Sequence, residues 1–198
     1  MELRALSGRL VEFSDSLLCV VDAQPGFAEK LDDRLARATV GRIAWITALA
    51  RTLDVPIVVT EEEPETNGAT LPEVLDQLPP TVTRHRKPTF GLADVPEIAE
   101  TVASTRRGTT VLVGMETDVC VSHSALGLLD TGYRVVVVRD AVAAPGAAHE
   151  QGLDRMRDAG AVLIGTKGLF YEWTRTVDRA SEVEERMAGA PWPDGLAL

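Results

Sequence analysis

TVLVGMETDVC, residues 110–120, joins a short apolar run to the start of a helical segment. Residues 110–113 are apolar or β-branched without polar alternation, which is typical of a strand buried on both faces of a sheet. Five more runs of this kind lie at residues 17–21, 55–59, 81–85, 133–138 and 161–164, of which 81–85 is the most polar. We therefore expect six strands.

The segments between these runs have the spacing of helices. Residues 35–53 repeat alanine, isoleucine and leucine three or four positions apart, and residues 119–129 and 151–159 behave likewise. Regular alternation of strand and helix predicts an α/β fold, with an open parallel sheet and helices on both of its faces.

The length of 198 residues predicts one domain over residues 1–198. The last ten residues, 189–198, contain Pro191 and Pro193, which a regular helix does not tolerate in its interior. We expect an extended tail there, anchored by Trp192 on its own subunit or on another.

The charge balance excludes two classes of partner. The chain has 30 acidic and 20 basic side chains and a net charge of −10, whereas nucleic acids and anionic membranes are bound mainly through lysine and arginine. The apolar runs are too short to span a membrane, and residues 1–13 lack a signal-peptide pattern. Two cysteines, Cys19 and Cys120, far apart in the chain, fit free thiols in a reducing cytoplasm.

Ligand sites of open α/β sheets lie beyond the carboxyl ends of the strands. The first strand ends at Asp22, the third at Lys87, and Cys120 opens the helix after the fourth. An acid, a lysine and a thiol from three strands are thus expected to meet in one crevice.

Cys120 at a helix start is expected to have a lowered pKa, because the helix dipole and a nearby lysine both stabilise a thiolate. A neighbouring carboxylate can take the thiol proton and pass it to a leaving group. Together these groups suit acyl transfer through a thioester. The alternative is that Cys120 is simply a small buried apolar residue, as free cysteine often is; Cys19, within the first strand, is expected to be structural.

Three local sequences resemble the signatures of the isochorismatase-like cysteine hydrolases, a family that includes nicotinamidases, N-carbamoyl amide hydrolases and isochorismatase. They are DAQPGF at 22–27, RKPTF at 86–90 and GMETDVCV at 114–121, in the family's order and spacing. The resemblance covers about residues 15–177. It implies a Rossmann-like three-layer α/β/α sandwich around a six-stranded, mostly parallel sheet, which agrees with the pattern of runs.

Carried over to this chain, the family pattern makes Cys120 the nucleophile, Asp22 the general base and acid, and Lys87 their electrostatic partner. The family also implies a cis peptide between Met115 and Glu116. This bond is expected to direct the Glu116 N–H beside the Cys120 N–H as an oxyanion hole.

The sequence differs from that of nicotinamidases at the residues that bind their metal ion. Those enzymes bind a divalent ion through an Asp-x-His after the second strand, whereas this chain has TEEEPE at 60–65, without an imidazole ligand for zinc. We predict no metal and no cofactor. The glutamates of this stretch are expected to form a solvated acidic loop, with weak calcium binding as the alternative. A less characterised subgroup of the family has a similar stretch with an amide where this chain has Glu62, so Glu62 is a candidate substrate-binding residue at a pocket rim.

Phe27 and Phe90 follow the aspartate and the lysine by short turns. They are expected either to line the substrate pocket or to fill the core. His123 lies one helical turn after Cys120 and is a weaker candidate for the catalytic base.

These patterns favour a cytoplasmic hydrolase that cleaves a small amide or a related C–N bond through a thioester. An isochorismatase-type vinyl-ether hydrolase and a catalytically idle oligomeric binding protein on the same fold are the alternatives. The resemblance also implies a homo-oligomer, a dimer or a tetramer, in which the Trp192 tail is a candidate interface element.

Overall fold

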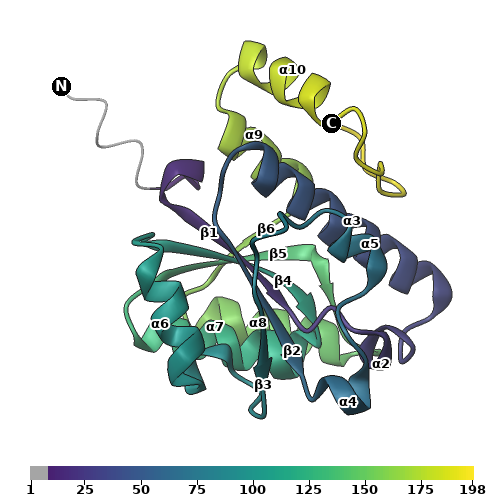
Figure 1. Ribbon diagram of the computed structural model, residues 1–198, viewed down its shortest axis with the longest axis vertical. Helices are drawn as coiled ribbons and strands as arrows, with labels where there is room; N and C mark the ends of the chain where they lie inside the picture. Colours follow the sequence, from purple (N-terminus) through teal and green to yellow (C-terminus); the bar gives the residue numbers. More distant parts are fainter. Residues whose placement is uncertain (1–8) are drawn as a thin grey trace.

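The computed structural model describes residues 9–198 and contains a six-stranded sheet in the order β3-β2-β1-β4-β5-β6 (Figure 1). Every neighbouring pair of strands is parallel. The strands are β1 Ser16–Val21, β2 Ile57–Glu62, β3 Arg84–Lys87, β4 Thr109–Met115, β5 Arg134–Ala143 and β6 Val162–Ile164. The expected α/β sandwich is confirmed, and the sheet is wholly rather than mostly parallel. Residues 1–8, which hold most of the segment that lacks a signal-peptide pattern, lie outside the described part.

Helices cover both faces of this sheet (Figure 1). The longer helices are α3 Asp33–Thr52, α6 Pro96–Ser104, α7 Ser122–Asp130, α8 Ala148–Asp158, α9 Thr166–Thr174 and α10 Val177–Arg186. Short turns of helix are η1 Phe13–Asp15, α2 Pro25–Ala28, α4 Pro64–Asn67, α5 Pro72–Leu75, η2 Leu92–Asp94 and the π-helical η3 Thr117–Val121.

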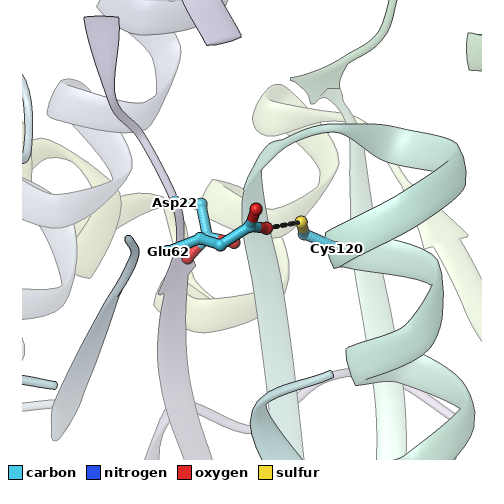
Figure 2. Close-up of side chains that lie close together, drawn as sticks. All are labelled: Asp22, Glu62 and Cys120. Carbon is cyan, nitrogen blue, oxygen red and sulfur yellow. Dashed lines mark hydrogen bonds between the residues drawn. The ribbon is translucent and has the colours of Figure 1, made fainter. Parts of the chain in front are cut away.

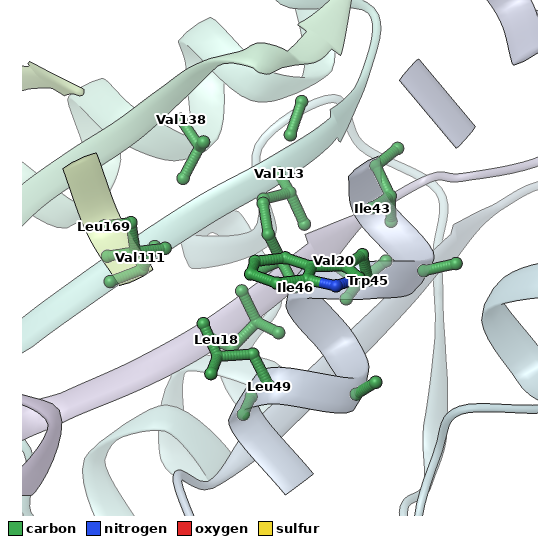
Figure 3. Packing of buried hydrophobic residues seen from close by; sticks show 14 of the residues in the cluster. Leu18, Val20, Ile43, Trp45, Ile46, Leu49, Val111, Val113, Val138 and Leu169 are labelled. Carbon is green, nitrogen blue, oxygen red and sulfur yellow. The ribbon is translucent and has the colours of Figure 1, made fainter. Parts of the chain in front are cut away.

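Alternate residues of β1 enter opposite cores. Leu18 and Val20 of β1 pack on the α3, α9 and α10 side, in the cluster around Trp45 (Figure 3). Leu17, Cys19 and Val21 enter the other core, against α6, α7 and α8. Because both faces of the strand are buried, its sequence is continuously apolar.

Helix α3 begins where the side chain of Asp32 caps it, accepting hydrogen bonds from the N–H groups of Arg34 and Leu35 at 3.1 and 3.0 Å. Its buried face carries Trp45, whose ring lies 5.7 Å from that of Phe170 in α9. The helix expected at residues 35–53 is confirmed, two residues earlier at its start.

Two strands differ in position from the sequence-based expectation. The strand expected at 81–85 lies at Arg84–Lys87, because the turn that follows Pro79 and Pro80 extends through Thr83. The strand expected at 55–59 continues to Glu62, where it pairs with Lys87 of β3.

The tail at 191–198 contains no helix or strand and lies against α3 of its own chain. The Trp192 ring meets the Trp45 ring edge-on at 5.9 Å, and Arg42 donates a hydrogen bond to the carbonyl of Asp194 at 3.1 Å. Trp192 remains 55% exposed. No helix among the described residues combines the length and the apolar character that crossing a membrane requires.

Candidate active site

The strand order reverses between β1 and β4, which is where open α/β sheets place their ligands. Gly114 in β4 allows the close approach of these two strands, because its φ is +129° and a Cβ there would lie 1.8 Å from the Val21 carbonyl oxygen. Asp22 follows β1 directly, and Cys120 lies in η3 just beyond β4. The two side chains therefore face one another across the switch point.

Lys87, the last residue of β3, is completely buried and fully bonded. Its Nζ lies 2.7 Å from Asp22 Oδ2 and donates to the carbonyl oxygens of Thr89 and Phe90 at 2.8 and 2.9 Å. An ammonium group has three protons, so these three oxygens account for all of them.

Asp22 is also completely buried, and both of its carboxylate oxygens have partners. Oδ2 contacts the Lys87 ammonium, and Oδ1 accepts a hydrogen bond from the Thr60 hydroxyl at 2.8 Å. Burial raises the pKa of the Asp22 carboxyl above its ordinary value, an effect that Lys87 and Thr60 oppose without cancelling. This carboxylate is therefore a stronger base than one in water.

Glu62, the last residue of β2, lies directly beside the thiol (Figure 2). Cys120 Sγ donates a hydrogen bond to Glu62 Oε2 at 2.9 Å, and this oxygen lies 3.7 Å from Lys87 Nζ. One carboxylate oxygen of Asp22, one of Glu62 and the sulfur of Cys120 all lie within 4.8 Å of one another. Glu62 therefore contacts the Cys120 sulfur directly, closer than its expected place at the rim of a pocket.

The backbone of Glu62 is held on both sides. The buried Gln24 side chain accepts from the Glu62 N–H at 2.8 Å and donates to the Glu62 carbonyl at 3.0 Å, and Asn67 donates to the same carbonyl at 3.0 Å. These bonds fix where the glutamate side chain starts.

The expected lowering of the Cys120 pKa is wrong. The residue is 1% exposed, and burial, the largest cause, raises the pKa of its thiol; the carboxylates of Asp22 and Glu62 raise it further, and Lys87 offsets only part of this. The helix start was predicted correctly, but the sulfur is desolvated and faces two acids. The resting group is a thiol that must lose its proton to react.

The peptide bond between Met115 and Glu116 is cis, as expected. The Glu116 side chain forms an ion pair with Lys30 at 3.1 Å, and the Lys30 ammonium lies 4.8 Å from the centre of the Phe27 ring. Glu116 N–H and Cys120 N–H remain predicted oxyanion donors.

The two phenylalanines have different surroundings. Phe27 is 4% exposed and belongs to the core cluster under α3. Of the two expected roles, Phe27 therefore has that of filling the core. Phe90 is 52% exposed and meets the ring of His123 edge-on at 5.7 Å. His123 is exposed and contacts Phe90, and its hydrogen-bonding partners within residues 9–198 do not include the Cys120 thiol.

The acidic stretch at 60–65 is not a uniformly solvated loop. Glu61 is buried and bonded to Thr70 and Arg84, whereas Glu63 and Glu65 both pair with Arg86. The glutamates therefore point in different directions and bind arginines. For Asp22 and Glu62, the cation in contact is the ammonium of Lys87.

The chain is similar in sequence to known proteins. Residues 16–168 match the Isochorismatase domain model. The secreted isochorismatase effector Isc1 of Phytophthora sojae is 34% identical over 170 residues, which span 83% of this chain and 79% of that protein.

Solved structures show the same fold. The MAR1 ribonuclease structure from Caenorhabditis elegans superposes with a TM-score of 0.83 at 26% identity, covering 96% of this chain and 98% of the other. The YcaC gene product of Escherichia coli, described as an octameric hydrolase of unknown specificity, gives a TM-score of 0.86 at 24% identity, covering 94% and 92%.

Proposed function

Because the chain belongs to the isochorismatase family, we propose that it is a hydrolase that cleaves a small amide or a related C–N bond through a thioester on Cys120. The observation that carries this proposal is the meeting of a thiol, a buried aspartate and a buried lysine at the switch point of the sheet. Nucleophile, base and orienting cation within contact distance are the parts that covalent acyl transfer needs.

In the first half of the reaction, the Cys120 S–H turns from Glu62 to the carboxylate of Asp22 in the same cluster. The proton passes to Asp22, and the sulfur attacks the substrate carbonyl carbon. The raised pKa of the Asp22 carboxyl supports this step, because it makes the carboxylate a better proton acceptor. Lys87 holds Asp22 in place and limits the cost of its charge. The N–H groups of Glu116 and Cys120 stabilise the oxyanion.

In the second half, Asp22 donates its proton to the departing amine as the C–N bond breaks, which leaves an acyl group on sulfur. A water molecule then gives a proton to Asp22 and attacks the thioester. The acid is released, and the proton returns from Asp22 to the thiol. The cycle consumes one water and needs no metal or cofactor.

An isochorismatase-type vinyl-ether hydrolase is the second candidate, favoured by the name of the Phytophthora sojae relative. We place it second because a thiol in contact with a carboxylate suits covalent attack on a carbonyl. RNA, the substrate class in the name of the C. elegans protein, fits less well. This chain carries a net charge of −10, and its nucleophile is 1% exposed.

We also propose a homo-oligomer located in the cytoplasm. The octameric YcaC neighbour is consistent with assembly, and both cysteines of this chain are free and buried, which suits a reducing compartment.

The test is a screen of small amides for ammonia release, repeated with Cys120→Ser and with Cys19→Ala as the matched control. Cys19 is buried within β1 and lies outside the cluster of Asp22, Glu62 and Cys120, so it serves as the control thiol. We expect turnover to disappear in Cys120→Ser and to persist in Cys19→Ala. Unchanged turnover in Cys120→Ser would overturn the mechanism; a wild-type protein that binds amides without cleaving them would indicate an idle scaffold.

A further inference from the structure

Among the residues that the structure describes, Glu62 receives no hydrogen bond from a cationic side chain, although its carboxylate lies in the proposed reaction centre, 3.7 Å from Lys87 Nζ. Within residues 9–198, the thiol of Cys120 is the group that donates a hydrogen bond to it. Lys87 is 3.7 Å away, and its three protons are already shared among Asp22, Thr89 and Phe90. When the sulfur loses its proton, Glu62 loses this donor.

Glu62 is also the solvent-facing member of the group. Its side chain is 16% exposed, whereas the side chains of Asp22 and Lys87 are completely buried and Cys120 is 1% exposed. A substrate that approaches the thiol from solvent therefore meets the Glu62 carboxylate as it reaches the sulfur.

Basic side chains around this end of the sheet are engaged with other carboxylates. In the described part of the chain, Lys30 pairs with Glu116, Arg84 with Glu61, and Arg86 with Glu63 and Glu65. None of these three pairs with Glu62.

We propose that Glu62 selects the charge of the substrate: its carboxylate binds a positively charged, hydrogen-bond-donating nitrogen next to the scissile carbonyl. The enzyme then accepts small amides that carry an ammonium group and discriminates against those that carry a carboxylate. This inference rests on the proposed function and names the substrate class of the same site. The ammonium replaces the S–H group as the donor to Glu62 once the thiolate has formed.

Two thiol reagents of opposite charge test this proposal without a known substrate. The probes are 2-aminoethyl methanethiosulfonate, a cation, and 2-sulfonatoethyl methanethiosulfonate, an anion. In both reactions the Cys120 thiolate attacks the sulfenyl sulfur, forms a mixed disulfide and releases methanesulfinate. The rate of modification at Cys120 is followed by peptide mass spectrometry, and the ratio of the two rates cancels any change in the thiolate fraction.

The control separates Glu62 from the general field of an acidic protein. Glu62→Gln and Glu63→Gln remove the same charge from neighbouring positions, but Glu63 pairs with Arg86 at 2.9 Å and does not contact the thiol. We expect the cation-to-anion ratio to fall about tenfold or more in Glu62→Gln, the loss that accompanies removal of a hydrogen bond between charged groups. It should stay near the wild-type value in Glu63→Gln. Equal ratios in the two variants would overturn the proposal.

Turnover gives a second measurement, with three small amides that share the CH2–CONH2 unit and differ in the charge of the group beside it: glycinamide, propionamide and malonamate. We expect kcat/KM to be highest for glycinamide and lowest for malonamate, and the preference to weaken in Glu62→Gln. Hydrolysis that depends on Cys120 but shows no charge preference would contradict this inference and leave the proposed function standing. Loss of the Cys120 dependence would instead contradict the proposed function, and the reagent ratio would still decide the role of Glu62.

Discussion

Lys87 and Asp22 form an ion pair whose Nζ and Oδ2 atoms are 2.7 Å apart, and both side chains are completely buried. The pair joins the edge strand β3 to the loop after β1, across β2. Removing one partner of such a pair leaves an uncompensated charge in the interior. The pair therefore links the stability of the fold to the chemistry of the site.

Lys87→Met should destabilise the protein by about 3–5 kcal/mol, because it leaves the Asp22 carboxylate buried without its cation. Urea unfolding measures this loss. The double variant Lys87→Met, Asp22→Asn should lose less stability than the sum of the two single variants, since it removes both charges. Strictly additive losses would mean that the two groups do not interact.

The same variant should change the dependence of stability on pH. Burial raises the pKa of Asp22 in the folded state, so the folded protein holds this proton more tightly than the unfolded chain, and stability falls as the pH rises through the interval between the two pKa values. Lys87 opposes that shift. In Lys87→Met we expect the fall in the free energy of unfolding, which begins at about pH 4 where an unfolded aspartate ionises, to continue to a higher pH than in wild type and to be larger in total. A fall that ends at the same pH as in wild type would contradict this.

Glu62→Gln should make Cys120 react at lower pH. The charge of Glu62 and its hydrogen bond to the thiol both raise the Cys120 pKa, and glutamine removes the charge at the same size. The rate of alkylation by iodoacetamide, followed against pH, should rise at lower pH in Glu62→Gln than in wild type. Glu63→Gln should follow the wild-type curve, and an unchanged curve in Glu62→Gln would contradict the contact.

Deletion of residues 189–198 should reduce the size of the proposed homo-oligomer. The tail covers part of α3 but leaves Trp192 55% exposed on its outer side, available to a second copy of the chain. Light scattering of the full-length and shortened proteins measures the assembly, and Trp192→Ala tests the side chain alone. An unchanged oligomer in the shortened protein would reject the tail as an interface element.

The sequence predicted the convergence of Asp22, Lys87 and Cys120 because parallel strands bring their carboxyl ends to one edge of the sheet. The sequence-based interpretation puts Glu62 at the end of the second strand, on the rim of a pocket, and does not include its contact with the thiol. The alternation of a strand was the available signal: Thr60 and Glu62 face Asp22 and Cys120, whereas Glu61 faces Arg84.

The direction of the Cys120 pKa could not be predicted from its place in the chain. A helix start favours a thiolate, but the desolvation that outweighs it comes from residues distant in sequence that pack around the sulfur. The burial of Phe27 under α3 likewise depends on residues that are distant in sequence. Local pattern located the candidate site residues, and tertiary packing sets the directions of their pKa shifts.

The central claim is that Cys120 forms a thioester, and the most direct measurement is the mass of the enzyme during turnover. Wild-type protein mixed with a small amide that it hydrolyses, quenched in acid, should gain the mass of the acyl group on the peptide that contains Cys120, and hydroxylamine should remove it. Asp22→Asn should form little of this species, because the base that accepts the thiol proton is missing. Turnover without an acyl group on Cys120 at any quench time, or an acyl group found instead on Cys19, would contradict the account.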